Sequence, residues 1–380
     1  MSTKPVADTP VDARSVELEA AMRLHLVPGI GPVTHGELVR VFGSPEGVLK
    51  ASPADIRNVP GVGPKLVLQL SLAKESTGVQ SQLELCRQND IQIITRSDAN
   101  YPKPLAEIYD PPNLLFCRGK LLDIDQVAIA IVGTRHASNY GRAIATRLAT
   151  GLAMAGFTIV SGLARGIDAA AHRAALAAGG RTVAVLGGGL LKMYPPEHAQ
   201  LAKEIEKSGA VLSESLPMQP PKSGSFPRRN RIVTGLCLGV IVVEAGERSG
   251  ALISARMAME QGREVFAVPG RVDSRMSRGC HRLISDGAKL VESIDDVLEE
   301  LGPLANPARI DPETSIRHPA EMKLSDQETN VLRAIGTEKT EFDAVVVVTG
   351  LPPARVLATI SVLEVRRLVR RVTGTSFVRV

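Results

Sequence analysis

Short, mostly apolar stretches alternate with helical patterns from residue 127 to residue 301, and this alternation constrains the fold more than any other feature of the chain. Parallel strands covered by helices on both faces have this character, because neither face meets water. We predict strands over 127–132, 158–160, 182–186, 210–212, 239–243, 264–268 and 289–291. Helical periodicity lies between most of them, over 141–155, 167–178, 197–207, 251–260 and 295–301. The pattern predicts an α/β domain with a doubly wound, Rossmann-like and mainly parallel sheet.

An internal repeat precedes this domain. Val-Pro-Gly-Ile-Gly-Pro at 27–32 recurs as Val-Pro-Gly-Val-Gly-Pro at 59–64, and helical patterns surround both copies. The turns resemble helix-hairpin-helix motifs, in which glycines and a helix N-terminus approach a phosphate. A plain helical bundle is an equally good interpretation, because Pro32 and Pro64 each remove one N–H. We predict an all-α helix-hairpin-helix or SAM-like domain over residues 1–80.

The rest of the chain divides into three parts. Strands over 91–95 and 114–117 open the α/β domain, which we place at residues 81–301, and a proline-containing linker follows at 302–323. Residues 324–380 predict a winged helix. In it Ser325 caps a helix through Ile335, helices follow at 342–348 and 353–365, and a hairpin pairs 370–373 with 376–380.

The distribution of charge indicates a polyanionic partner. The whole chain has a formal net charge of +5, and residues 226–282 alone contain ten Arg and Lys residues against five Asp and Glu residues. A concentrated basic surface favours a polyanion, whereas a merely solvated face is the plain alternative. Aromatic residues are only 3% of the chain, and there is no Trp. We therefore expect base stacking to be a minor part of any nucleic-acid contact.

Three arginines within four positions form the most basic block. Arg228, Arg229 and Arg231 follow a proline-rich approach, and a buried strand then ends at Glu244. A turn containing Ser249 and Gly250 follows and opens a helix. This order predicts guanidinium groups beside the carboxyl edge of the sheet, where open α/β sheets bind ligands. Arginine forks match phosphate oxygens two at a time, so the block favours a phosphate-rich ligand.

Glycine-rich loops follow three of the predicted strands, at 133–135, 161–168 and 187–189. All three would lie along one edge of the sheet, where N–H groups and helix N-termini favour anions. A single nucleotide needs one such loop. Several loops in a row, with Arg135 and the arginine block beside them, suit the backbone of a single-stranded nucleic acid.

Nothing in the pattern predicts a catalytic residue, a cofactor or a metal. The chain has neither the G-x-G-x-x-G fingerprint nor a Walker A loop, and neither Ser161 nor Ser249 sits in G-x-S-x-G. Asp168 and His172 are four positions apart on one helix face, but no third ligand stands nearby. The four cysteines are scattered, residues 1–15 contain no apolar signal core, and no apolar run reaches the length of a membrane helix. We expect a cytoplasmic protein that does not bind a membrane.

Six ordered motifs resemble the DNA-processing protein A family, also called DprA or Smf, from about residue 90 to residue 301. They are Ile-Val-Gly-Thr-Arg at 131–135, Ser-Gly-Leu-Ala-Arg-Gly-Ile-Asp-Ala-Ala-Ala-His at 161–172, Tyr-Pro-Pro-Glu-His at 194–198, Phe-Pro-Arg-Arg-Asn-Arg-Ile-Val at 226–233, Val-Val-Glu-Ala at 242–245 with Ser-Gly-Ala-Leu-Ile-Ser-Ala-Arg at 249–256, and Val-Phe-Ala-Val-Pro-Gly at 265–270. Two positions depart from the family pattern: Leu191 replaces the usual Asp, and His281 replaces a frequent Asn.

The resemblance implies a function without catalysis. It implies single-stranded DNA binding by the Rossmann domain and a homodimer through that domain. It also implies loading of the RecA recombinase in natural transformation and in DNA repair, with single-strand-binding protein displaced or tolerated. Carried over by motif, the DNA groove would use Arg135, Ser161, Gly162, Gly166, Arg228, Asn230, Arg231, Ser249 and Gly250, with Arg229 in the same block. Candidate auxiliary DNA contacts are Lys192, Arg256, Arg366, Arg367, Arg370 and Arg371.

Structural interpretations of the same residues remain open. Asn230 could only cap the helix that follows the arginines, the glycines could only serve turn geometry, and Arg135 could pair with Glu244. Two other functions also remain open. One is an enzyme resembling the lysine-decarboxylase-like phosphoribohydrolases, although their Pro-Gly-Gly-x-Gly-Thr loop is missing here. The other is a transcription regulator whose winged helix reads duplex DNA through the arginines at 366–371.

Overall fold

The computed structural model describes residues 13–73, 78–301, 326–336, 339–365, 368–373 and 376–379. The chain forms two compact units, Met1–Ala308 and Arg309–Val380. Each unit is treated by itself below. The predicted linker at 302–323 lies outside the described residues.

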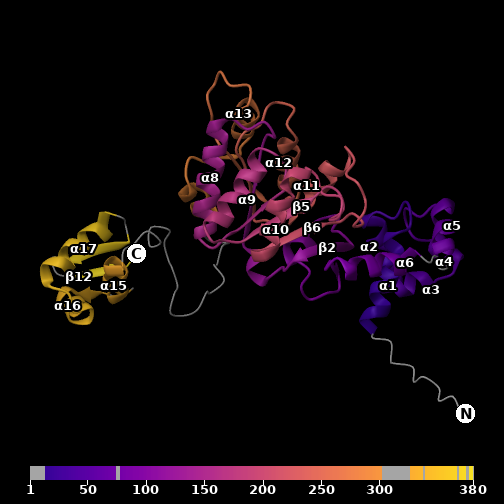
Figure 1. The fold of residues 1–380 in the computed structure, drawn as a ribbon, viewed down its shortest axis with the longest axis horizontal. Helices are drawn as coiled ribbons and strands as arrows, with labels where there is room; N and C mark the ends of the chain where they lie inside the picture. Colours follow the sequence, from indigo (N-terminus) through magenta and orange to yellow (C-terminus); the bar gives the residue numbers. More distant parts are fainter. Residues whose placement is uncertain are drawn as a thin grey trace, which may run out of the picture. The chain divides into compact units, whose positions relative to one another are not determined.

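A nine-stranded sheet forms the centre of the first unit, in the order β1-β2-β6-β5-β4-β3-β7-β8-β9. Figure 1 labels its strands β2, β5 and β6. The strands from β6 to β9 in this order run parallel, and β1 and β2 are antiparallel additions at one edge. The prediction of a mainly parallel sheet is confirmed, with each of the seven strands predicted after residue 126 found within one residue of its expected bounds. The strands are β1 Gln92–Thr95, β2 Leu114–Gly119, β3 Ala128–Val132, β4 Thr158–Ser161, β5 Thr182–Leu186, β6 Ala210–Ser213, β7 Gly239–Val242, β8 Glu264–Ala267 and β9 Lys289–Leu290.

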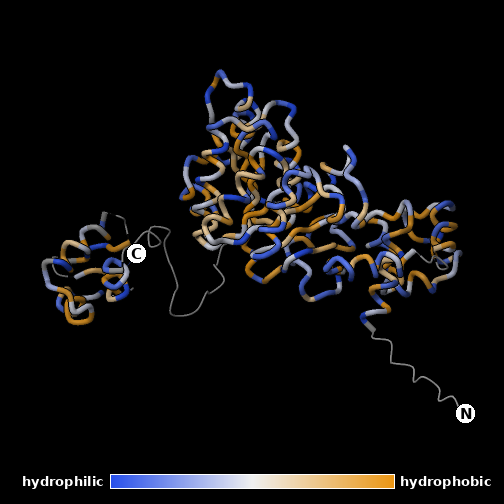
Figure 2. Tube along the Cα trace, in the orientation of Figure 1, coloured by the Kyte–Doolittle hydropathy of each residue, from blue (hydrophilic) through white to orange (hydrophobic). Residues whose placement is uncertain are grey.

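Helices cover both faces of this sheet, as the apolar strands require. In β3, Ala128 and Ala130 pack toward α11, α12 and α13, whereas Ile129 and Ile131 pack toward α8, α9 and α14. In Figure 2 hydrophobic segments run through the part of the first unit where Figure 1 labels β2, β5 and β6. The helices of this domain are α7 Lys103–Ala106, α8 Asn139–Met154, α9 Ile167–Ala177, α10 Ala199–Ser208, α11 Ser225–Gly235, α12 Gly250–Glu260, α13 Arg278–Ser285 and α14 Ile294–Leu301, with 3-10 turns at Asp123–Gln126 and Pro196–His198.

The arginine block lies inside a helix, which the sequence did not predict. We expected an irregular approach to the arginines and a helix after them, but α11 begins at Ser225 and contains all three. Pro227 is compatible with this because a proline in the first turn of a helix costs no hydrogen bond. Asn230 therefore lies in the middle of α11, and its interpretation as a helix cap is wrong.

Among the described residues six helices precede the sheet, and the first five form a helix-hairpin-helix region with its own core. In the two repeats Gly29 and Gly61 have φ of 94° and 81°, which favours glycine. Pro32 and Pro64 each begin a helix, at the position where an N–H would have no helical partner. The helices are α1 Ala13–His25, α2 Pro32–Phe42, α3 Pro45–Lys50, α4 Pro53–Arg57, α5 Pro64–Ala73 and α6 Gly78–Gln88. Helices α1 and α6 also pack on the sheet beside β1 and β2.

The second unit is a winged helix, as predicted. Its three-stranded sheet has the order β10-β12-β11, and its core surrounds the buried Phe377. Ser325, Arg366 and Arg367 lie outside the described residues. The elements are α15 Asp326–Ala334, β10 Thr340–Glu341, α16 Phe342–Thr349, α17 Pro353–Val365, β11 Val369–Thr373 and β12 Ser376–Arg379. Across the described part of both units, no helix combines the length and apolar character needed to cross a bilayer.

Candidate nucleic-acid interface

The loops that follow the parallel strands meet at the carboxyl edge of the sheet, as the topology requires. A Cβ on Gly166 would lie 2.3 Å from the carbonyl oxygen of Thr134, so the loop after β4 touches the loop after β3. The Asn230 side-chain amide in α11 donates to the carbonyl of Gly250 at the start of α12, at 3.5 Å. The structure thus brings the predicted site residues of four chain segments to one edge.

An internal carboxylate occupies the anion-binding position between β3 and β7. Glu244 is 4% exposed and accepts hydrogen bonds from the backbone N–H of Ser138 at 2.9 Å and from its hydroxyl at 2.5 Å. A Cβ on Gly141 would lie 2.2 Å from the carboxylate. Strand order changes direction between β3 and β7, and there a nucleotide phosphate would meet the N-terminus of α8. The Glu244 carboxylate fills that position. Ser138 holds it there, and not the ion pair with Arg135 that the sequence suggested.

A second carboxylate organises the loop after β4. Asp168 is buried and accepts from the backbone N–H groups of Gly162 and Ala164, at 3.1 and 3.3 Å. Ser161 is fully buried, and its hydroxyl donates to the carbonyl of Ile131 at 2.6 Å. Two N–H groups of this loop, those of Gly162 and Ala164, therefore already have an internal acceptor. The predicted DNA contacts of Ser161, Gly162 and Gly166 stay predictions.

Two of the three arginines in the basic block are buried and bound to acceptors inside the protein. Arg229 is 7% exposed and donates to the carbonyl of Val185 at 2.9 Å, and a Cβ on Gly162 would overlap its guanidinium. Arg231 is 5% exposed, and its guanidinium pairs with Glu214 at 2.6 Å and with Asp110 at 3.2 Å. Only Arg228 has a largely exposed side chain, with a long contact of 3.4 Å to Glu214. A phosphate can approach Arg228 without breaking a buried pair.

Three side chains from separate loops and Phe226 from the first turn of α11 form a chain of cation–π and aromatic contacts, which we call the stacking ladder. The Arg135 guanidinium lies over the Phe226 ring at 4.7 Å, Phe226 and Tyr194 are 5.9 Å apart between ring centroids, and the Arg165 guanidinium lies over Tyr194 at 5.7 Å. Glu197 holds Arg165 at 2.5 Å. Cation–π and aromatic contacts of this kind fix rings in place. Both cations of the ladder are exposed, and so is Tyr194.

The ladder contains two of the few aromatic residues of the chain. The small number of aromatic residues suggested a minor role for stacking, but two of them, Phe226 and Tyr194, lie together at the predicted edge. Neither was among the predicted site residues. The signal was present in the sequence, since Phe226 stands two positions before Arg228 and Tyr194 opens the Tyr-Pro-Pro motif.

The remaining predicted residues divide by exposure. The Ser249 hydroxyl accepts from the N–H of Ala251 and caps α12, with Gly250 exposed beside it. Lys192 and Arg256 are exposed at the surface of the first unit. In the winged helix Arg370 is exposed, whereas Arg371 pairs with Glu364 at 3.2 Å and lies over Phe377.

Asp168 and His172 do not form a metal pair. The Thr182 hydroxyl donates to the carbonyl of Ile159 at 2.6 Å, so it accepts from Nδ1–H of His172 at 2.7 Å. The other ring nitrogen of His172 is buried without a partner. No three His, Cys, Asp or Glu side chains within the described ranges are grouped to hold a metal ion. His172 is a neutral residue of the core.

Acid should therefore destabilise the fold below pH 6.5. Burial lowers the pKa of His172 to about 3 and that of His35 to about 4. The unfolded chain protonates these two histidines more readily than the folded chain does. The folded state is therefore most stable above pH 6.5, where both histidines are neutral, and its free energy of unfolding falls as the pH falls. At pH 5 each histidine should lower the free energy of unfolding by about 2 kcal/mol relative to its value at neutral pH. Urea unfolding at pH 5 and 7.5 measures this. His172→Asn should reduce the pH dependence, whereas His136→Asn, at an exposed position, should leave it unchanged; equal dependence in both variants would contradict the assignment.

Fold and site together define a Rossmann-type protein whose sheet edge carries exposed cations and stacked aromatic rings, flanked by two folds common among nucleic-acid-binding proteins. The family model described as DNA recombination-mediator protein A matches residues 92–302. Models of the DprA winged helix domain and of a SAM-like helix-hairpin-helix tandem match residues 315–375 and 22–73. The chain belongs to the DNA recombination-mediator protein A family, also called DprA or Smf.

Relatives of known name support this over most of the chain. Protein Smf of Synechocystis is 35% identical over 93% of this chain and 96% of its own length. DNA processing protein DprA of Streptococcus pneumoniae is 50% identical over 53% of this chain and 72% of its own. The solved structure of the pneumococcal protein has a TM-score of 0.67 at 38% identity, covering 74% of this chain and 97% of that one. DNA processing protein A from Helicobacter pylori, solved to explain its single-stranded DNA binding mode, has a TM-score of 0.51 at 32% identity, covering 57% of this chain and 98% of that one.

Proposed function

We propose that this chain binds single-stranded DNA without sequence preference along the carboxyl edge of the sheet and loads RecA onto it, as a recombination mediator in natural transformation and in DNA repair. The observation that carries the proposal is the stacking ladder with the exposed Arg228 beside it on α11. Successive bases stack on aromatic rings while cations follow the phosphates, and neither contact depends on sequence. The named binding mode of the Helicobacter pylori relative agrees with this.

The predicted residues take two roles in this proposal. Arg135, Arg228 and Lys192 contact phosphates, Phe226 and Tyr194 contact bases, and Asn230, Ser249, Gly250 and Arg256 line the groove. The residues that hold the edge in shape are the buried Ser161, Gly162, Arg229 and Arg231 and the half-buried Gly166. Residues 81–301 bind the strand and form the homodimer in the cytoplasm. The regions at 1–80 and 324–380 are accessory, with Arg366, Arg367, Arg370 and Arg371 as further contacts, and single-strand-binding protein is displaced or tolerated.

The occupied anion position disfavours the enzymatic alternative. A nucleotide-processing Rossmann protein needs the phosphate position at the strand-order reversal free, and here Glu244 is hydrogen-bonded into it. A second carboxylate, Asp168, takes the N–H groups of the next loop. A negatively charged nucleotide would have to displace both. The proposed DNA path therefore runs over exposed side chains and leaves these N–H groups with their internal acceptors.

Equilibrium binding of labelled oligo-dT across a salt series tests the proposal. Counterion release makes log affinity fall linearly with log salt, by about 0.7 per phosphate neutralised on a single strand. We expect Arg228→Ala to weaken binding and to reduce the slope by about 0.7. Arg87→Ala is the matched control, since Arg87 is similarly exposed and also pairs with a glutamate, on α6. No binding at low salt, or equal slopes in both variants, would sink this placement.

RecA loading has its own readout. On DNA coated with single-strand-binding protein, RecA hydrolyses ATP only after a delay, and a mediator should shorten that delay. We expect the unchanged protein to shorten it and Arg228→Ala to do so less well. An undiminished delay, despite tight DNA binding, would leave a DNA-binding protein without the mediator function.

A further inference from the structure

The row of loops at the carboxyl edge of the sheet continues past α11. The loop after β7, at residues 243–249, and the loop after β8, at residues 268–277, come next, because β8 lies beside β7 and runs parallel to it. Two hydrogen bonds of 2.8 Å join this region, one from the N–H of Ala245 to the carbonyl of Met276 and one from the N–H of Gly279 to the carbonyl of Ala245. The two loops therefore form one surface.

Arginines outnumber carboxylates on this surface and on the helix α13 that follows it. Residues 271–282 contain four arginines, and Arg248 on the loop after β7 is a fifth. Three of the five have a carboxylate partner: Arg271 with Asp273 at 2.8 Å, Arg278 with Glu247 at 3.6 Å and Arg282 with Asp286 at 3.6 Å. The other two, Arg248 and Arg275, are exposed, and neither side chain has a hydrogen-bond or ion-pair partner among the described residues. We call Arg248 and Arg275 the distal arginines.

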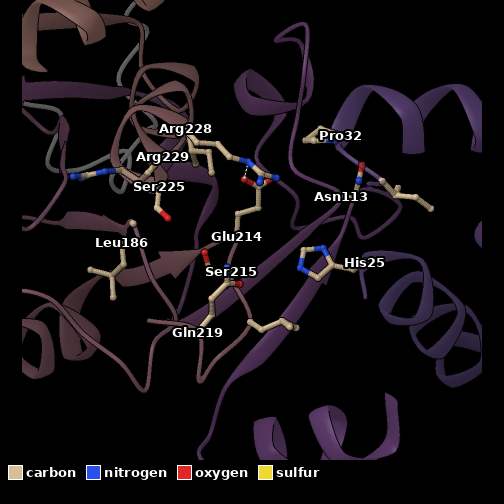
Figure 3. A pocket seen from close by; sticks show the side chains of 14 residues that line it. His25, Pro32, Asn113, Leu186, Glu214, Ser215, Gln219, Ser225, Arg228 and Arg229 are labelled. Carbon is tan, nitrogen blue, oxygen red and sulfur yellow. Dashed lines mark ion pairs between the residues drawn. The ribbon is translucent and has the colours of Figure 1, made fainter. Parts of the chain in front are cut away.

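Carboxylates close the opposite direction. On the side of α11 that faces β6, the Glu214 carboxylate lies against Arg228 (Figure 3), and the side chain of Asp110 is 34% exposed. The cation that pairs with both carboxylates, Arg231, has a side chain that is only 6% exposed. A phosphate that turned this way from Arg228 would meet two carboxylates whose main counter-charge is buried, and charges of the same sign repel.

A chain of contacts connects α11 to the distal arginines. Asn230 in α11 donates to the carbonyl of Gly250 at the start of α12, at 3.5 Å. Arg248 stands two positions before Gly250. A Cβ on Gly246 would lie 3.5 Å from the carbonyl oxygen of Arg275, so the backbones of the two loops touch beside the distal arginines. A strand that leaves the arginine block over the start of α12 therefore reaches unpaired guanidinium groups.

We propose that the bound single strand continues from the stacking ladder over the distal arginines, so that the DNA site has two segments. The first segment holds bases on rings and a phosphate on Arg228. The second holds phosphates alone, since residues 243–249 and 268–277 contain no aromatic side chain. Guanidinium forks bind phosphate oxygens two at a time, and phosphate contacts carry no base information. The second segment thus lengthens the site without adding sequence preference. The inference rests on the proposed function.

Oligo-dT of increasing length, from about 4 to 16 nucleotides, tests the inference with the full-length protein, by anisotropy across a salt series. A short oligomer fills the ladder segment alone, and a longer one also reaches the distal arginines. We expect the salt slope of the unchanged protein to grow with length, by about 0.7 for each further phosphate neutralised. Arg248→Ala/Arg275→Ala should bind the shortest oligomers with unchanged affinity and should lose about 1.4 from the slope of the longest.

Arg271→Ala/Arg282→Ala is the matched control. It removes the same charge from the same region, but both of these arginines already pair with a carboxylate. A long-range field would respond equally to the two double variants, whereas phosphate contact should affect the distal variant more. Arg248→Lys/Arg275→Lys keeps the charge and should keep most of the slope. Melting temperatures should stay unchanged, because the distal arginines are exposed and have no partner among the described residues.

The outcomes separate this inference from the proposed function. Binding of all oligomers with a slope that does not grow with length, or with equal slopes in the two double variants, would overturn the distal segment and keep the function. No binding of any oligomer would overturn both. A length-dependent loss in the distal variant, together with full affinity in Phe226→Ala, would support the distal segment and move the strand away from the ladder. The length series of the unchanged protein needs no variant to fold.

Discussion

Replacing Arg231 with alanine is expected to lower the free energy of unfolding by about 3–5 kcal/mol, the usual result of removing one partner of a buried ion pair. The Arg231 side chain is 6% exposed, and it neutralises both Glu214, whose side chain is 12% exposed, and Asp110. In the alanine variant the Glu214 carboxylate stays largely buried, and its remaining cationic contact is the one with Arg228 at 3.4 Å. Urea unfolding followed by circular dichroism measures the loss.

Arg228→Ala is the matched control on the same helix. Its side chain is 58% exposed and its contact with Glu214 is long, so the loss of stability should stay within about 1 kcal/mol. Equal losses of unfolding free energy in the two variants would show that the buried ion pairs of Arg231 do not stabilise the fold as expected. A variant that replaces both arginines would mix a folding defect with a binding defect. DNA affinities should therefore be compared through Arg228 alone.

The strands were predictable because burial on both faces makes each of them apolar throughout. All five residues of β3 are buried, and those of β5 and β6 follow the same rule. Helix α11 escaped prediction for the opposite reason. Its buried positions begin with Arg229 and Arg231, so the usual apolar stripe of a helix is broken by charge. Their polar partners come from β5 and from the loops at residues 110 and 214, which no local pattern reveals.

The site was predictable in its location but not in its contacts. Parallel strands place their following loops at one edge, so Arg135 and the arginine block were expected to meet there. The sequence does not say which acceptor each N–H finds. Glu244 binds Ser138 across 106 positions of the chain, and the ladder joins Arg135, Arg165 and Tyr194 from three separate loops to Phe226 at the start of α11. Such pairings depend on the packed sheet, whereas turn and motif patterns describe only one loop at a time.

Replacing Phe226 with alanine is expected to weaken oligo-dT binding by about 5- to 150-fold, the loss of one base–aromatic stack. Because no charge is removed, the salt slope should remain that of the unchanged protein. Phe226→Tyr keeps the ring and should keep the affinity. The melting temperature of each variant shows whether the packing of Phe226 beside Gly187 is retained.

Phe226→Trp gives a direct view of the same contact, because the chain contains no other Trp. A base that stacks on the indole should quench its fluorescence in proportion to the DNA bound, at the same concentrations at which anisotropy of labelled oligo-dT reports binding. The combination distinguishes the two components of the proposed interface: loss of Arg228 changes the salt slope, and loss of the ring changes affinity alone. Binding of oligo-dT without quenching, or a Phe226→Ala variant with full affinity, would move the strand away from the ladder and leave the exposed arginines as its contacts.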